Sequence, residues 1–167
     1  GAKYDPELGQ GRRQLPFETS DLVFGLAPLL NAAGRIADAG TATQLLLTRD
    51  AHRAAELAQL LHYRNTIRRE YDYRTTEEAQ ALWGEDKSAA SRQTIVLFQP
   101  HWHPGILGIV ASRIAKAYQR PTIILTRSGE VLQGSARSIA GIDIHAALES
   151  CSDILLQFGG HSFAAGK

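Results

Sequence analysis

The sequence contains no methionine and only one cysteine, Cys151. A single cysteine cannot form a disulfide within the chain, which fits a reducing compartment and predicts a cytoplasmic protein. No apolar run approaches the ~18 residues that a membrane span requires, and we identify no signal peptide, so no membrane partner is expected. The missing methionine, even at position 1, predicts that the chain is a piece excised from a longer protein.

The chain also lacks a strong net charge. Its 18 basic and 17 acidic side chains leave a formal charge of +1. Long-range attraction of a polyanion is therefore not expected, and any nucleic-acid site has to be local. The 167 residues, 44% of them hydrophobic, are enough for one domain with a buried core, with or without an appendage.

Two segments precede a predicted long helix. Residues 1–20 are polar and rich in Gly, Pro and Arg, and we interpret them as a linker or as the remnant of a preceding region. Residues 21–50 are expected to be broken at Pro28 and Gly34 and to contain a short helix after Gly40.

Residues 51–83 are predicted to form one helix, because neither Gly nor Pro interrupts them and apolar residues recur at spacings near three or four, apart from the step from Leu61 to Ile67. Asp50 is the expected N-cap. Such a helix would be about 50 Å long, a length typical of a helix that bridges two bodies. Two shorter helices with a kink near Asp72 are the alternative. With its second body absent, the helix is expected to protrude or to pack on another molecule through Leu57, Leu61 and Ile67.

Strands and helices alternate after a polar loop at 84–93. Strands are predicted at 94–98, at 121–125 and over "LQGSARSI", helices at 105–119 and 143–151, and "LLQFGGHSFAAG" is expected to start as a helix. The alternation predicts an α/β domain over 94–167, with a mixed sheet flanked by helices.

Ligands of open α/β sheets bind where strands end and helices begin, so the polar residues at these junctions form the candidate site. His101 and His103 stand just before a helix, where they would contact a substrate phosphate or, equally well, cap the helix and pack. A metal site at this pair is weakly supported, because no Asp or Glu lies in the same junction.

The segment "GSARS" offers a second candidate. Arg137 has the planar guanidinium that suits phosphate, and Ser135 and Ser138 add hydroxyls. Taken alone, this pattern slightly favours a solvent-facing edge strand.

The closing stretch "FGGHSFAAG" is the third candidate. Gly159 and Gly160 could form a nest of backbone N–H groups for an anion, with His161 at its rim, and the small residues would let a helix press against a neighbour. The alternative is a turn between helices with a C-cap glycine.

The segment "NAAGR" is the fourth candidate, because Asn31 and Arg35 bracket small residues. The alternative is a helix that ends at a Gly34 cap.

Taken in order, the motifs "LAPLLNAAGRI", "WHPGILGIVASR", "GSARSI" and "FGGHSFAAG", with the long helix after the first, resemble the RecJ family of single-strand-specific DNA exonucleases, within the DHH phosphoesterase superfamily. The resemblance covers about residues 22–166. The "GGHxxAAG" pattern marks the DHH-associated domain, which other DHH phosphoesterases and alanyl-tRNA synthetases share. The motifs "NAAGR" and "HPGILGIVASR" are more specific to RecJ.

The resemblance implies a role in DNA repair and recombination, with digestion of single-stranded DNA from its 5′ end by two Mn²⁺ or Mg²⁺ ions. The metal ligands would belong to an N-terminal DHH domain, and this chain contains no Asp-His-His triplet. The chain alone is therefore expected to hold no cofactor, to contain no catalytic residue and to be inactive. Single-stranded DNA is the implied partner, together with the single-stranded-DNA-binding protein.

The resemblance also implies a role for each segment of the chain. Residues 21–50 would be the tail of the catalytic-domain side, and 94–167 a DHH-associated domain without its final strands. Asn31 and Arg35 would lie near the metal centre. The residues implied in gripping the strand are Ser135, Arg137, Ser138, Gly159, Gly160, His161 and His103.

One position departs from the family pattern. Leu29 follows Pro28 where the family usually has an arginine, and leucine cannot pair with phosphate. Either that arginine is not essential, or the chain is a divergent member with altered substrate use.

Two other functions compete with this one. The first is a DHH-family phosphodiesterase of short oligonucleotides or cyclic dinucleotides. The second is a non-catalytic RNA-binding module like that of alanyl-tRNA synthetases, which predicts no Arg35 facing a cleft. The long helix and "NAAGR" favour the exonuclease.

Overall fold

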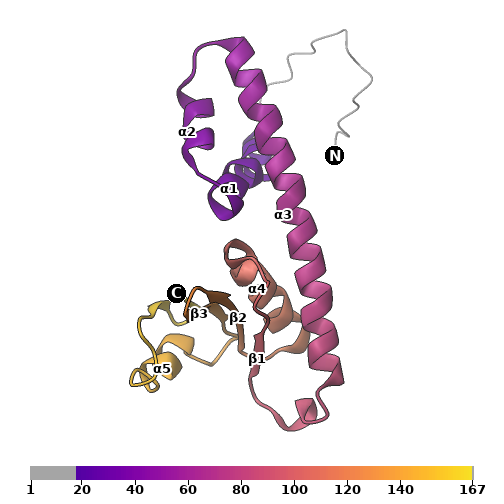
Figure 1. The fold of residues 1–167 in the computed structure, drawn as a ribbon, viewed down its shortest axis with the longest axis vertical. Coiled ribbons are helices and arrows are strands. Elements are labelled where there is room, and N and C mark those ends of the chain that lie inside the picture. Colours follow the sequence, from indigo (N-terminus) through magenta and orange to yellow (C-terminus); the bar gives the residue numbers. More distant parts are fainter. Residues whose placement is uncertain (1–17, 167) are drawn as a thin grey trace.

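The computed structural model describes residues 18–166, and Figure 1 shows two lobes joined by one helix. This helix, α3 (Ala51–Glu85), has 35 residues and begins at the predicted cap, where the Asp50 side chain accepts hydrogen bonds from the backbone N–H groups of His52 and Arg53. It passes through Asp72 without interruption and ends slightly beyond the predicted boundary at 83. The bridging-helix prediction is therefore confirmed, and the two-helix alternative is wrong.

The N-terminal lobe consists of α1 (Ala27–Ile36) and α2 (Gly40–Leu47), which pack on the first half of α3. Its core joins the buried residues Ala33, Ala42 and Leu61 to the partly buried leucines 29, 30 and 45. The helix predicted after Gly40 is confirmed. The expectation that α3 exposes Leu57 and Leu61 is wrong, because the chain's own α1 and α2 provide the second lobe; both leucines are buried.

The predicted breaks at Pro28 and Gly34 are also wrong, because both residues lie inside α1. Pro28 is the second residue of α1, and a wider π-helical segment, η1 (Asp21–Leu26), leads directly into it. Gly34 lies within the last turn, and Ala37 rather than Gly34 is the C-cap.

The C-terminal lobe is built on one five-stranded sheet with the order β1-β2-β3-β5-β4. Strands β1 and β2 are parallel, and all other neighbours are antiparallel. The mixed α/β fold predicted from the sequence is therefore confirmed. The strands are β1 (Ile95–Phe98), β2 (Thr122–Ser128), β3 (Val131–Arg137), β4 (Gly159–His161) and β5 (Ala164–Gly166).

Helix α4 (Leu107–Tyr118) makes the crossover between β1 and β2 and covers one face of the sheet. On this face Ile95 and Ile124 are fully buried in a core that also includes Trp83 from the end of α3. A short helical turn, η2 (Ala89–Ser91), connects α3 to β1. The lobe is thus fixed to the bridging helix by its main core.

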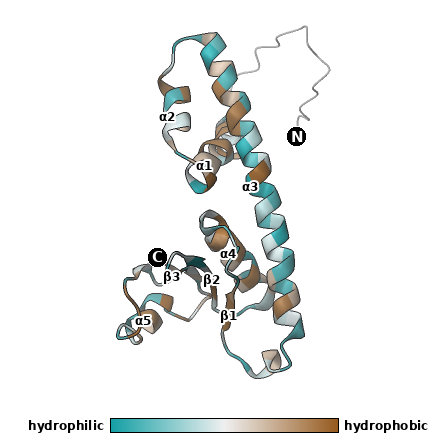
Figure 2. Cartoon of the chain, in the orientation of Figure 1, coloured by the Kyte–Doolittle hydropathy of each residue, from teal (hydrophilic) through white to brown (hydrophobic). Residues whose placement is uncertain are grey.

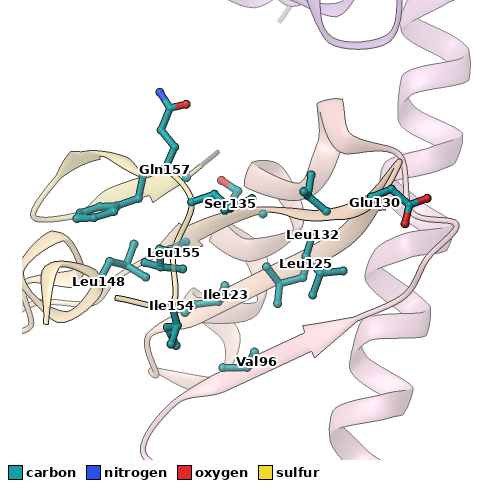
Figure 3. A pocket seen from close by; sticks show the side chains of 16 residues that line it. Val96, Ile123, Leu125, Glu130, Leu132, Ser135, Leu148, Ile154, Leu155 and Gln157 are labelled. Carbon is teal, nitrogen blue, oxygen red and sulfur yellow. The ribbon is translucent and has the colours of Figure 1, made fainter. Parts of the chain in front are cut away.

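The opposite face of the sheet is only partly covered. Helix α5 (Ile144–Glu149) packs near Ala136 and Ala165. Beside it lies an apolar cavity of about 440 Å³ (Figure 3), and Glu130 is the one charged residue among the described residues that line it. An anionic carboxylate in an apolar cavity does not suit a phosphate, so this face is not the candidate site.

The closing stretch forms the hairpin of β4 and β5, so the prediction that it starts as a helix is wrong. Gly160 pairs with Ala165 and has a φ of +151°, and a Cβ placed on it would lie 2.3 Å from the carbonyl oxygen of Ala164. Glycine is needed here because the two strands approach closely. The expected anion nest at Gly159 and Gly160 is not formed, since the backbone lies in a strand ladder instead.

Hydrophilic residues dominate the stretch of α3 that lies between the two lobes (Figure 2). Within residues 18–166, no helix is both long enough and apolar enough to cross a membrane.

Candidate nucleic-acid interface

The two lobes touch where the end of α1 meets η3 (Pro104–Ile106), the turn that leads into α4. The Arg35 guanidinium donates to the carbonyl oxygen of Gly105 over 3.4 Å. A Cβ placed on Gly105 would lie 1.7 Å from the carbonyl oxygen of Arg35, so only glycine fits at this contact. This contact therefore sets the distance between α1 and the sheet.

Three arginines from different elements gather beside this contact: Arg35 on α1, Arg68 on α3 and Arg137 on β3. We call them the arginine cluster. Burial lowers the pKa of the Arg137 guanidinium, and the positive charge of Arg35 lowers it further. Burial also lowers the pKa of Arg68; the charge of Asp72 partly offsets this, and the charges of Arg69, Arg35 and Arg113 lower it further. The cluster is thus a site where like charges are held together.

Asp72 supplies the only carboxylate that pairs with this region in the described part of the chain. Its side chain is 3% exposed and accepts from Arg113 on α4 over 2.9 Å and from Arg68 over 3.5 Å. Neither Arg35 nor Arg137 forms an ion pair within residues 18–166. Four arginines and one aspartate leave an excess of positive charge that a bound anion would neutralise.

The sheet holds Arg137 at a fixed position and leaves room in front of it. Its guanidinium donates to the Ser135 hydroxyl over 2.9 Å and to the carbonyl oxygen of Ala136 over 2.7 Å. A Cβ on Gly108 of α4 would lie 2.5 Å from the guanidinium, so this glycine makes space for it. These contacts orient the guanidinium before any ligand arrives.

Two rows of paired residues cross β3, β5 and β4 next to the arginine cluster. One row is Arg137, Ala164 and His161, and the other is Ser135, Gly166 and Gly159. Paired residues on neighbouring strands point to the same face, and the outer two members of each row are about 9.5 Å apart. Between Arg137 and His161 the sheet therefore carries nothing larger than a methyl group. The small residues of the closing stretch form a low floor beside the arginines.

The structure brings several of the predicted residues together. Arg137 lies next to both Ser135 and Arg35. His161 lies on the face of the sheet from which Arg137 projects. Asn31 is exposed and stands one helical turn before Arg35, so it shares that side of α1.

Two other predicted residues have local roles. The Ser138 hydroxyl donates to the carbonyl oxygen of Ile142 over 2.7 Å and fixes the loop after β3. His103 is the N-cap of η3, because its Nδ1 accepts from the Gly105 N–H over 3.1 Å. Its ring packs against Tyr71 with 5.4 Å between ring centroids, and burial lowers its pKa. A contact of either residue with substrate stays a prediction.

His101 does not join this group. Its Nε2 lies 3.0 Å from a carboxylate oxygen of Glu78, which also accepts from the indole N–H of Trp102 over 2.8 Å. This contact ties the loop after β1 to α3. Within residues 18–166, no three His, Cys, Asp or Glu side chains are grouped so that they could hold a metal ion.

Three residues of the site, Arg68, Asp72 and Arg113, were not predicted from the sequence. Asp72 lies on the stripe of buried residues of α3, where a carboxylate requires a cationic partner, but this burial comes from tertiary packing and the sequence pattern did not indicate it. Leu29, which departs from the family pattern, packs against the core of the N-terminal lobe.

Comparisons with known proteins identify the C-terminal lobe with a described domain. A family model of the DHHA1 domain matches residues 90–167. The single-stranded-DNA-specific exonuclease RecJ of Dickeya dadantii is 42% identical over 156 residues, which are 88% of this chain and 27% of that protein. RecJ of Bacillus subtilis is 40% identical over 145 residues, 86% of this chain and 18% of that protein.

A solved structure extends this similarity to three dimensions. The crystal structure of RecJ from Thermus thermophilus in complex with Mn²⁺ has a TM-score of 0.77 and 38% identity, over 87% of this chain and 21% of that one. The chain therefore spans about a fifth to a quarter of the length of the relatives described here.

Proposed function

Because this chain belongs to the RecJ family and carries a DHHA1 domain at residues 90–167, we propose that it is the strand-binding part of a metal-dependent exonuclease that digests single-stranded DNA from the 5′ end in DNA repair and recombination. The single observation that carries the proposal is the arginine cluster. It combines partly desolvated guanidinium groups from both lobes with a low, small-residue floor on the sheet.

In this proposal Arg137 and Ser135 hold one phosphate of the strand, and Arg35 and Arg68 approach it from the other lobe. Guanidinium groups bind phosphate oxygens through paired N–H donors, and these bonds strengthen where water is partly excluded. His161, Gly159 and Gly160 border the floor on which the sugar and backbone lie. Asn31 shares the Arg35 side of α1 and faces the region where the catalytic centre of the complete enzyme would lie. The same proposal assigns a role to each segment. Residues 21–50 belong to the side of the catalytic domain, and residues 94–167 are the domain that binds the strand.

The described residues do not fit the two-metal centre that hydrolysis by this route requires. No suitable group of three ligands exists between residues 18 and 166, and the chain contains no Asp-His-His triplet. Relatives of this chain have been solved with Mn²⁺ and with Mg²⁺. We assign the metals of the complete enzyme to a part outside this sequence, and a contact with single-stranded-DNA-binding protein and a cytoplasmic location stay predictions.

The 167-residue chain alone is expected to show no nuclease activity. The reason is that its arginines can bind a phosphodiester but cannot activate water for attack on it. The measurement is incubation of the purified chain with labelled single-stranded DNA in Mn²⁺, followed by gel analysis. Digestion that a chelator abolishes would contradict this assignment.

The position of Arg35 disfavours the RNA-binding module, because that alternative predicts no Arg35 facing a cleft. In this chain Arg35 reaches across to the carbonyl oxygen of Gly105, and its charge acts on Arg137.

Arg137→Ala is expected to weaken binding of single-stranded DNA by about tenfold or more, because it removes a charge-assisted hydrogen bond worth about 1.5–3 kcal/mol. The slope of log affinity against log salt should also become shallower, by about 0.7 for each phosphate that the variant no longer neutralises. Fluorescence anisotropy of a labelled oligonucleotide at several salt concentrations measures both quantities.

The matched control is Arg127→Ala, which removes the same charge from an exposed position on β2, outside the cluster. This variant should bind as the wild type does. Equal affinities and equal salt slopes for wild type and Arg137→Ala would reject the phosphate assignment.

A further inference from the structure

A groove with aromatic walls lies between the lobes, lined by residues that neighbour the contact of Arg35 with Gly105. Its volume is about 290 Å³, and its walls come from the end of α1, from α3 and from the loop before η3. Three of its lining side chains have flat rings: Tyr63, Tyr71 and His103. No function described above uses this groove.

The groove begins where the arginine cluster ends. Ile36 and Ala37, which line it, directly follow Arg35 in the chain. A strand whose phosphate contacts Arg35 would therefore place its next nucleotide at the mouth of the groove.

The charges around the groove favour binding of a negatively charged strand beside it. Among residues 18–166, its lining contains Arg64 and no acidic side chain. Arg64 is fixed in place, because its Nη1 donates to the Thr41 hydroxyl over 2.7 Å and to the carbonyl oxygen of Asp38 over 3.3 Å. Arg64 therefore gives the groove a fixed positive charge.

The rings are placed for stacking. Tyr63, Ile67 and Tyr71 follow one another at intervals of one helical turn on α3, so the two tyrosines stand about 12 Å apart along the helix axis with Ile67 between them. The His103 ring packs on Tyr71 at an interplanar angle of 31°. Tyr63 is 64% exposed and Tyr71 is 44% exposed, so both side chains keep surface that a ligand can reach.

We propose that this groove binds one nucleobase of the strand whose phosphates the arginine cluster holds, with the base stacked on Tyr71 and His103. The inference rests on the proposed function and deepens it, because it adds recognition of the base to recognition of the backbone. Stacking accepts every base, since each has a flat π face, and the site is therefore expected to be tolerant of sequence.

The test compares two probes that have the same phosphates: a short labelled oligothymidylate and an oligonucleotide of the same length with abasic residues. The wild-type chain should bind the oligothymidylate more tightly. Tyr71→Leu keeps apolar bulk and suits a helix, but it removes the ring. It should weaken binding of the oligothymidylate by about five- to tenfold and leave binding of the abasic strand unchanged.

Tyr73→Leu is the matched control, because Tyr73 is 64% exposed on the same helix and does not line the groove. It should leave both affinities unchanged. Circular dichroism of each variant verifies that α3 remains helical, and Tyr71→Phe should retain the preference for the strand with bases.

The outcomes separate the two proposals. If Arg137→Ala weakens binding but wild type and Tyr71→Leu show no preference for bases, the groove proposal is overturned and the phosphate site stands; a groove that serves a protein partner would give this result. If neither oligonucleotide binds in a salt-dependent way, the proposed function fails, and the groove proposal fails with it.

Discussion

Gly105→Ala is expected to separate the two lobes and to reduce the affinity for single-stranded DNA by at least about tenfold. The added Cβ would overlap the carbonyl oxygen of Arg35 at 1.7 Å, and both partners are backbone, so no side-chain rotation relieves the clash. Forcing one methyl group into a filled contact costs about 1–3 kcal/mol in a typical core, and more where backbone must move. Either α1 or η3 has to shift, which carries Arg35 away from Arg137.

The C-terminal lobe should remain folded in this variant, because its core of Ile95, Ile124 and Trp83 is not touched. Gly105→Ala is therefore expected to disturb the arrangement of the arginine cluster without unfolding the sheet. A distance measurement between spin labels on α2 and α4, combined with anisotropy titration of labelled single-stranded DNA, reports both.

Gly84→Ala provides the matched control for this substitution. Gly84 lies in the last turn of α3, and a Cβ placed on it would meet nothing within 4 Å. Alanine there should leave binding unchanged and stabilise the helix by up to about 1 kcal/mol. An unchanged interlobe distance and unchanged affinity in Gly105→Ala would show that the contact at Gly105 does not position Arg35.

The start and length of the bridging helix could be predicted from its local sequence. The way in which the helix packs on the two lobes could not be predicted. Asp50 and the absence of Gly and Pro over 51–83 suffice for its start and length, because capping and propensity are local properties. The apolar spacing fails between Leu61 and Ile67. In the structure the buried stripe of α3 becomes polar at Asn65, inside this gap, and continues with Asp72 one to two turns later; Arg68 bonds to both. The gap in periodicity thus lies next to the polar part of the stripe.

The error at the closing stretch has a different cause. The sequence "FGGHSFAAG" contains no β-branched residue and three glycines, so its composition did not indicate a strand. Its strands form because Ala165 and Gly166 pair with β3 and because Gly160 permits close approach of β4. Both are tertiary contacts, which a local pattern does not report.

The candidate site was predictable where its residues are chemically specialised. Arg35, Arg137 and Ser135 stood out as phosphate ligands in small-residue surroundings, and the fold brings them together. Arg68 and Arg113 could not be distinguished from the many solvent-facing charges of helical segments. Their roles depend on Asp72, whose burial appears only when α4 packs on α3.

Asp72→Ala is expected to destabilise the fold by about 3–5 kcal/mol, because it removes the sole carboxylate of a mostly buried ion-pair network and leaves Arg68 without a counterion. The Asp72 side chain is 3% exposed and Arg68 is 16% exposed, so water does not replace the missing bonds. Arg113 is 55% exposed and should recover hydration, which keeps the loss within this range. Asp72→Asn, which keeps the shape and one acceptor oxygen, should be destabilised less than Asp72→Ala.

Chemical denaturation measures this effect, and Glu70→Ala is its matched control. Glu70 pairs with Arg74 on the same helix at the same spacing, but its side chain is 55% exposed, so its loss should change the free energy of unfolding by about 0.5 kcal/mol or less. The destabilisation of Asp72→Ala should also become smaller as salt is added, since screening relieves the repulsion among the unpaired arginines. A free energy of unfolding for Asp72→Ala equal to that of Glu70→Ala would mean that Asp72 does not hold α4 against α3, and that the arginine cluster is positioned by the sheet and the Gly105 contact alone.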